Sequence, residues 1–287
     1  MIYRRRPSPL HSARAGAGCA YCLALAVAAL MLSNPVALGA LTVSVLGAGI
    51  AAGVGRELGR AARLALVLAV AITVINALVT RNGLTVIWRL GDLPLLGHTD
   101  LTLEATAYGA VLGLRAVAVI LCGALYTATV DPDEVLRLFR RVSFRSALTA
   151  TLATRMVGVL IRDSHRLADA QRCRPGRPPS RLALMRAASS GVLDRALDIA
   201  AALEVRGYGA AARLPRARRP YSRHDLAFTV SAAGVIGLGI AGGLGGLAPF
   251  SAYPTLNLPT GAAAAAVSAA LIVCALLPFA DRRGITR

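Results

Sequence analysis

The feature that most constrains the fold is a succession of six apolar runs, separated by segments whose basic residues are all arginine. The runs cover residues 19–32, 36–54, 64–80, 107–130, 226–247 and 261–280. A helix of about 20 apolar residues can span a bilayer, and helical structure satisfies backbone groups that find no water in lipid. The composition, 56% hydrophobic and 5% aromatic, is also typical of membrane proteins. We therefore predict an all-α polytopic membrane protein with about six membrane helices, of which the first two could instead form a re-entrant pair.

The arginines predict how these helices are oriented. All but three of the 32 basic residues lie on the side that holds both termini and residues 131–224. The exceptions are Arg81, Arg89 and Arg115, the last of which lies inside the fourth run. Because cytoplasmic loops carry an excess of basic residues, both termini and residues 131–224 are predicted to be cytoplasmic, at the inner (plasma) membrane. In a soluble protein a net charge of +18 would suggest nucleic acid, but this placement favours membrane lipids and no nucleic-acid partner.

The N-terminal region allows two further interpretations. Its arginines and first apolar run have the outline of a secretory signal peptide. The second apolar run begins almost at once, which favours a membrane segment instead. Cys19 and Cys22 form a CxxC pair, but a single pair is a weak signal for a metal or redox site. We expect these cysteines to pack as small apolar side chains, and we expect no metal site and no cofactor.

The polar segments divide the chain into three expected parts. These are N-terminal membrane helices at 1–130, a cytoplasmic region at 131–224 and C-terminal membrane helices at 225–287. The cytoplasmic region opens with a helix-start signal formed by Asp131, Pro132 and Glu134. The short amphipathic helix that follows suits either the surface of the inner leaflet or docking to another protein.

Two long helices are predicted between Arg145 and Gly209. In the first, apolar residues recur at helical spacing at Leu148, Leu152, Met156, Leu160 and Leu167. In the second, a nearly heptad seam is formed by Leu182, Met185, Ser189, Leu193, Ala196, Ala200 and Leu203. Each helix would be about 40 Å long. Because a short proline-rich segment joins them, we expect the two helices to pack on each other through one seam.

Each of these helices ends in an arginine-bearing motif. The first motif contains Gln171, Arg172 and Arg174, followed by Pro175. The second contains Ala202, Glu204, Arg206 and Gly207, with Gly207 suited to the left-handed residue that ends a helix. A guanidinium at such an end can bind carboxylates or carbonyls of a partner, or it can belong to a solvated basic face near anionic lipid. The repetition favours two equivalent contacts on a paired partner.

Arg115 is the one arginine inside an apolar run. A charge near the middle of a bilayer costs about 3 kcal/mol, so Arg115 must face other helices or a polar cavity. We favour a structural anchor that bonds backbone carbonyls over a contact for a transported ion. The apolar runs contain no carboxylate or histidine that could form a proton relay with it.

The region from Ala107 to Gly209 resembles the transmembrane T component of energy-coupling factor (ECF) transporters, the CbiQ/EcfT family. That family carries two Ala-Arg-Gly motifs at its coupling helices. The second is matched by Ala202 to Gly209, with Val205 in place of alanine. The first is matched by Ala170 to Arg174, with Cys173 in place of alanine and Pro175 in place of glycine.

The resemblance implies a non-catalytic transporter subunit. Two cytoplasmic ABC ATPases would each receive one coupling-helix end, and a separate membrane substrate-binding (S) subunit would capture a vitamin or a transition-metal ion. The ATP site cannot lie in this chain, because a Walker A loop needs a lysine and the sequence has none. Two other classes remain as alternatives, namely a membrane-embedded enzyme and a membrane scaffold with a basic cytoplasmic face.

Overall fold

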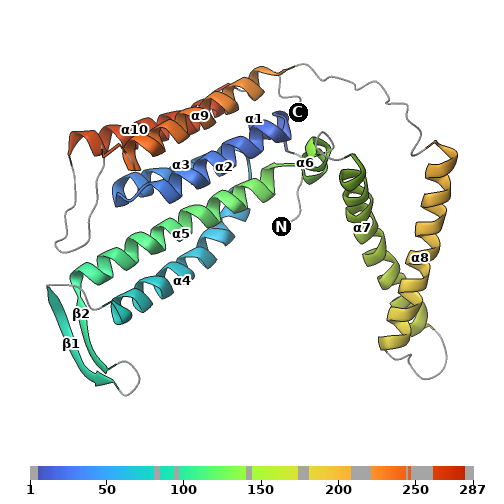
Figure 1. Cartoon of the computed structure of the whole chain (residues 1–287), viewed down its shortest axis with the longest axis horizontal. Helices are drawn as coiled ribbons and strands as arrows, with labels where there is room; N and C mark the ends of the chain where they lie inside the picture. The colour runs from blue at the N-terminus through green and yellow to red at the C-terminus, as the bar shows by residue number, and fades with distance from the viewer. Residues whose placement is uncertain are drawn as a thin grey trace. The chain divides into compact units, whose positions relative to one another are not determined.

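The structure is a computed structural model that describes residues 6–80, 85–93, 97–139, 144–173, 181–207, 221–243, 245–246 and 261–281. The chain divides into two compact units. The first unit combines residues 1–135 with residues 221–287, and the second consists of residues 136–220. The first unit carries the apolar helices, and the second carries the two long arginine-rich helices (Figure 1).

Most elements of the first unit are helices. They are α1 (Pro9–Ser12), α2 (Ala15–Met31), α3 (Pro35–Ala51), α4 (Gly55–Val79), α5 (Leu103–Thr129), α9 (Arg223–Gly243), α10 (Ala262–Leu276) and the 3-10 turn η1 (Leu277–Phe279). Local signals explain several starts. Asn34 caps α3 by accepting a hydrogen bond from the Val36 amide at 2.8 Å, with Pro35 in the first turn. The helix α6 (Pro132–Phe139) begins as predicted, with the Asp131 carboxylate accepting from the Asp133 amide at 2.9 Å.

The apolar helices confirm the prediction of an all-α polytopic membrane protein. Among the described residues, α4, α5, α9 and α10 with η1 are long and apolar enough to cross a membrane, and α2 and α3 are shorter apolar helices. The two shorter helices have 17 residues each, or about 25 Å, slightly less than the roughly 30 Å of a bilayer core.

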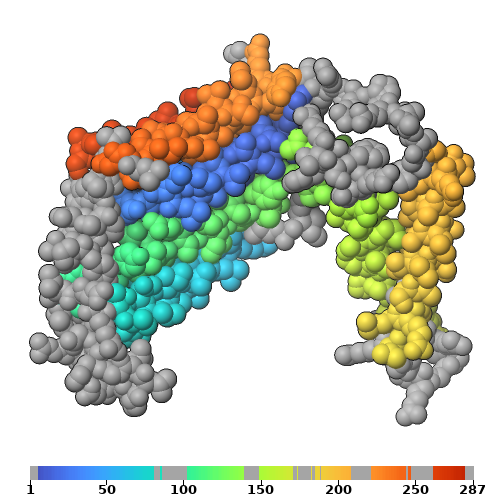
Figure 2. Space-filling view, in the orientation of Figure 1, coloured from blue at the N-terminus to red at the C-terminus, as the bar shows by residue number. Residues whose placement is uncertain are grey.

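These helices lie side by side in a fixed order. Figure 1 shows α9 and α10, then α2 and α3, then α5 and finally α4, and the same bands of colour follow one another on the surface in Figure 2. The helix α2 lies near the centre, where its Tyr21 is completely buried against Phe228 and Phe279 in edge-to-face contacts. The Tyr21 hydroxyl donates to the carbonyl of Ala275 at 2.8 Å, so the aromatic cluster joins α2, α9 and the end of α10.

Small residues bring α4 and α5 into close contact. Gly109 and Gly113 are four positions apart on α5 and lie against the backbone of Thr73 and Ala69 on α4. This spacing of small residues is the usual way in which membrane helices approach closely, since apolar side chains gain little by leaving lipid. In contrast, only 17% of an apolar 18-residue stretch of α4 is buried within the chain, compared with 44% of the corresponding stretch of α5. The helix α4 is therefore held along one face and open along the other.

The polar connection expected between the third and fourth apolar runs contains a β-hairpin. The strands β1 (Val86–Leu93) and β2 (Gly97–Thr102) pair antiparallel. Its base is fixed by Glu104, which is buried at the start of α5 and accepts from the Thr85 hydroxyl at 2.8 Å. This hairpin was not predicted from the sequence, because a short pair of strands among charged residues has little hydrophobic periodicity to indicate it.

Candidate functional site

The second unit is built around α7 (Phe144–Arg172) and α8 (Arg181–Val205), which run in opposite directions (Figure 1). An ion pair joins them, with Arg195 Nη1 2.7 Å from Asp163 Oδ2. The side chains of both residues are partly exposed, so the pair stabilises the unit only modestly. The hydrogen bond from Arg195 holds the pKa of Asp163 below its usual value.

The apolar face predicted for α7 is turned toward its neighbour. Its described members Leu152, Met156, Leu160 and Leu167 are all half-buried. The more exposed residues Val157 and Ile161 lie between them in the sequence. The periodicity of this helix therefore identified the correct face.

The seam predicted for α8 does not pack on α7. Leu182, Met185 and Leu193 are 67%, 71% and 64% exposed, and of the predicted seam only Leu203 is half-buried. The half-buried face instead consists of Val192, Arg195, Ile199 and Leu203. This face contains the partner of Asp163, so the ion pair and the seam lie on different sides of the helix. The prediction of a single shared seam is wrong because α8 has two apolar stripes, and the one that carries Arg195 is the one that packs on α7.

The described part of the second motif forms an exposed helix end. Ala202, Glu204, Arg206 and Gly207 are all exposed, and Val205 is 89% exposed. The last turn is closed by hydrogen bonds from the Arg206 amide to the Ala202 carbonyl and from the Gly207 amide to the Glu204 carbonyl, at 3.2 and 2.9 Å. Gly207 has a φ of 73°, which confirms the predicted left-handed end. Among the described residues, no ion-pair partner is found for Arg206.

The first motif lies at the end of α7. The helix includes Gln171 and Arg172, and the exposed Cys173 closes its last turn with a hydrogen bond to the Asp169 carbonyl at 3.2 Å. Arg174 and Pro175 lie outside the described residues. Because α7 and α8 are antiparallel and meet at Asp163 and Arg195, the ends of the two helices point away from each other. At 1.5 Å per residue they are separated by about 30 Å, so the structure does not bring the two motifs together.

Arg115 lies on α5 and reaches the break between α2 and α3. Its Nη2 donates to the carbonyl of Leu32 at 3.0 Å, and Leu32 is the completely buried residue that follows α2. Carbonyls at the end of a helix have no partner within that helix, so they are natural acceptors for an intramembrane arginine. The contact supports a structural role for Arg115, which stays a prediction.

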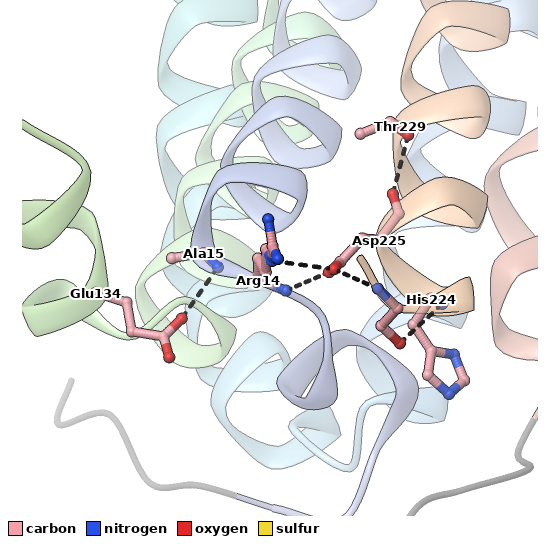
Figure 3. Close-up of polar contacts among 7 residues, drawn as sticks. Arg14, Ala15, Glu134, His224, Asp225 and Thr229 are labelled. Carbon is pink, nitrogen blue, oxygen red and sulfur yellow. Dashed lines mark hydrogen bonds and ion pairs between the residues drawn. The ribbon is translucent and has the colours of Figure 1, made fainter. Parts of the chain in front are cut away.

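Sequence reasoning missed a cluster of polar contacts at the start of α2 (Figure 3). Asp225 on α9 is 2% exposed, and its Oδ1 accepts from the Arg14 amide at 2.6 Å. Its Oδ2 lies 3.3 Å from Arg14 Nε. Glu134 on α6 accepts from the Ala15 amide at 3.2 Å. Glu134 was predicted only as part of the start of α6. The sequence signal for Asp225 was an acid directly before an apolar run, a position that is equally typical of a solvated helix start.

Comparison with known proteins identifies the family. A family model described as CbiQ, cobalt transport protein, matches residues 7–216, which is more than half of the chain. No match is found among curated proteins. The matched region includes both arginine motifs of the second unit, as well as α1 to α6. The chain therefore belongs to the CbiQ family of cobalt transport proteins, the family of the T components of ECF transporters, and is a membrane-embedded transport component.

Proposed function

We propose that this chain is the coupling subunit of an ABC-type ECF importer. In this proposal it connects two cytoplasmic ATPases to a separate S subunit in the membrane, and it catalyses no reaction itself. Its residues 131–224 and both termini face the cytoplasm at the inner membrane, and residues 1–130 and 225–287 provide the membrane helices. The family description favours a transition-metal ion as the substrate, while a vitamin remains the second possibility for this class of importer.

The observation that carries the proposal is the exposed end of α8. Arg206 is exposed at the last turn, next to the exposed Val205 and directly before the left-handed Gly207. A guanidinium in this position can donate two parallel hydrogen bonds to carboxylates or carbonyls of a partner, and the valine offers apolar area beside it. An end of this kind suits insertion into a groove of another protein.

The antiparallel arrangement of α7 and α8 supports two separate docking points. Their ends lie about 30 Å apart, which is too far for one small binding site and suitable for one contact on each of two ATPases. In this proposal Arg174 makes the contact at the end of α7. Because Pro175 stands where the family has glycine, we expect the contact of Arg174 to be the weaker of the two.

The test compares Arg206→Ala with Arg162→Ala in the complete transporter. Arg162 is exposed beside the Asp163–Arg195 pair and lies about 15 Å along the helix axes from the ends of both α7 and α8, so it is a matched control. Loss of one member of a closed charged contact costs about 2 to 5 kcal/mol. Arg206→Ala should therefore weaken ATPase binding at least about thirtyfold and abolish most uptake, while the protein still inserts into the membrane. Arg206→Lys should recover little, because an ammonium lacks the planar fork.

The measurements are quantitative pull-down of the ATPases and uptake by reconstituted transporter. Equal ATPase binding and uptake for Arg206→Ala, Arg162→Ala and the unmodified chain would show that the coupling assignment is wrong. In that case the arginines would be better explained as a basic surface beside anionic lipid.

A further inference from the structure

The chain crosses between its two compact units at two places. It leaves the first unit after Val135 and returns to it at Tyr221. Glu134 and Asp225 lie close to these crossings in the sequence, on α6 and α9. Both acids bind the start of α2, as described above (Figure 3). The start of α2 is therefore bound by one acid near each of the two crossings.

These two acids supply hydrogen-bond acceptors for amide groups at the start of α2. The first amide groups of a helix have no partner within it, and the helix dipole favours negative charge there. Arg14, the capping residue of α2, makes no side-chain capping bond of its own. The carboxylates of Asp225 and Glu134 bind the amides of Arg14 and Ala15 in its place. The cap of α2 is thus supplied by two distant segments.

Asp225 also binds the segment at which the chain returns to the first unit, as follows. The second carboxylate oxygen of Asp225 accepts from the Ser222 amide at 2.9 Å, and the Arg14 guanidinium lies 4.2 Å from the centre of the Tyr221 ring. Residues 221, 222 and 225 therefore all contact Arg14 or the carboxylate that binds it. A buried carboxylate with both oxygens engaged in charge-assisted contacts is a rigid connection.

The same N-terminal segment is anchored at its other end. Arg6 donates to the Gly53 carbonyl at the turn between α3 and α4, and its Nη2 lies 2.5 Å from Glu57 Oε1. Between these anchors, α1 packs against α9 and η1. The start of α2 is consequently held on both sides, and α2 itself lies near the centre of the first unit, between α9 and α5 (Figure 1).

We propose that the start of α2 is the point through which motion of the 136–220 unit reaches the membrane helices, with Asp225 and Glu134 as positioning residues. Displacement of α6 or of the first turn of α9 would move α2, because the acids tie them to its first two amides. The helix α2 would pass the motion to its neighbours α5 and α9. This inference rests on the proposed coupling function and names the residues inside the first unit that carry it.

The experiment uses the complete transporter in proteoliposomes and measures ATP hydrolysis, substrate uptake and the amount of assembled complex. The variants are Asp225→Ala, Asp225→Asn and Glu134→Gln, with Asp198→Asn on an exposed site of α8 as a matched change of charge. We expect all three substitutions at Asp225 and Glu134 to keep ATP hydrolysis within about twofold of the unmodified chain. We expect Asp225→Ala to lower the ratio of uptake to hydrolysis about tenfold. Asp225→Asn should recover part of this ratio, because its carbonyl still accepts from Arg14.

A merely structural role would lower hydrolysis and uptake in proportion to the assembled complex, with no change in their ratio. An unchanged ratio in Asp225→Ala, or loss of assembly in both Asp225→Asn and Glu134→Gln, would overturn the proposal. Arg206→Ala is measured in the same preparation to separate the two proposals. If it loses the ATPases while Asp225→Ala keeps the normal ratio, only this inference is wrong; if it behaves as the unmodified chain, the coupling function itself is wrong.

Discussion

The crossing of α4 and α5 allows a quantitative test of how the first unit is held together. A Cβ atom added at Gly113 would lie 2.8 Å from the carbonyl oxygen of Ala69 and 3.2 Å from its Cα. Both of these atoms belong to the backbone of α4, so neither can rotate away as a side chain would. Gly113→Ala must therefore move one helix relative to the other.

The size of the effect follows from two opposing contributions. Overpacking at a close contact destabilises by about 1 to 3 kcal/mol, while replacing glycine by alanine in a helix stabilises by about 1 kcal/mol. Gly123 lies on the same helix with nothing within 4 Å of an added Cβ, so Gly123→Ala carries only the second contribution. Gly113→Ala should consequently be less stable than Gly123→Ala by about 1 to 3 kcal/mol, which is roughly 5- to 150-fold in the unfolding equilibrium constant.

The assay is reversible unfolding of the purified chain in mixed micelles, followed by the helical circular dichroism signal as the denaturing detergent increases. The free energy of unfolding is compared between the two alanine variants, so that effects of the detergent cancel. Equal stability of Gly113→Ala and Gly123→Ala would refute the close approach of α4 and α5 through Gly113.

Three further predictions concern orientation, nucleotide use and pH. A cysteine introduced at Asn257 should react with an impermeant reagent in intact cells and one at Ser180 should not; labelling at Ser180 would contradict the cytoplasmic placement of residues 131–224. The purified chain should neither bind nor hydrolyse ATP, and turnover in a preparation shown to lack ATPases would disprove this. The lowered pKa of Asp163 means that its pair with Arg195 stabilises the folded unit fully above the usual carboxyl pKa of about 3.9 and is lost as the pH falls through the lower folded value. The distribution of distances between spin labels on α7 and α8 should therefore broaden in acid. The Asp163→Asn variant should show the broad distribution already at neutral pH.

Much of the fold could be predicted because its signals are local. Long apolar runs predicted the membrane helices, and Asp131 with Pro132 marked a helix start that the structure contains. Gly207 was expected to end α8 because a left-handed residue is cheapest as glycine, and its φ is 73°. The hairpin β1–β2 was not predicted, since its strands are short and lack a clear alternating pattern.

The candidate site was predicted only in part. The exposed end of α8, with Glu204 and Arg206, follows from the motif and from the helix stop after it. The role of these residues in binding ATPases stays a prediction. Asp225 was not recognised, because its partner Arg14 is 211 positions away in the sequence and an acid at a helix start is ordinary.

The sequence by itself determined which segments are helices and which residues share a face of each helix. Hydrophobic periodicity and capping residues depend only on neighbours within a few positions, so they can be read from one segment alone. Only the tertiary structure decided which face meets which partner. On α8 both apolar stripes satisfy helical spacing, and only the tertiary structure shows that the stripe carrying Arg195, the partner of Asp163, is the one that packs on α7. Likewise, the burial of Asp225 depends on the arrival of α2 beside α9, because a carboxylate can be buried only where distant groups neutralise it and satisfy its hydrogen bonds.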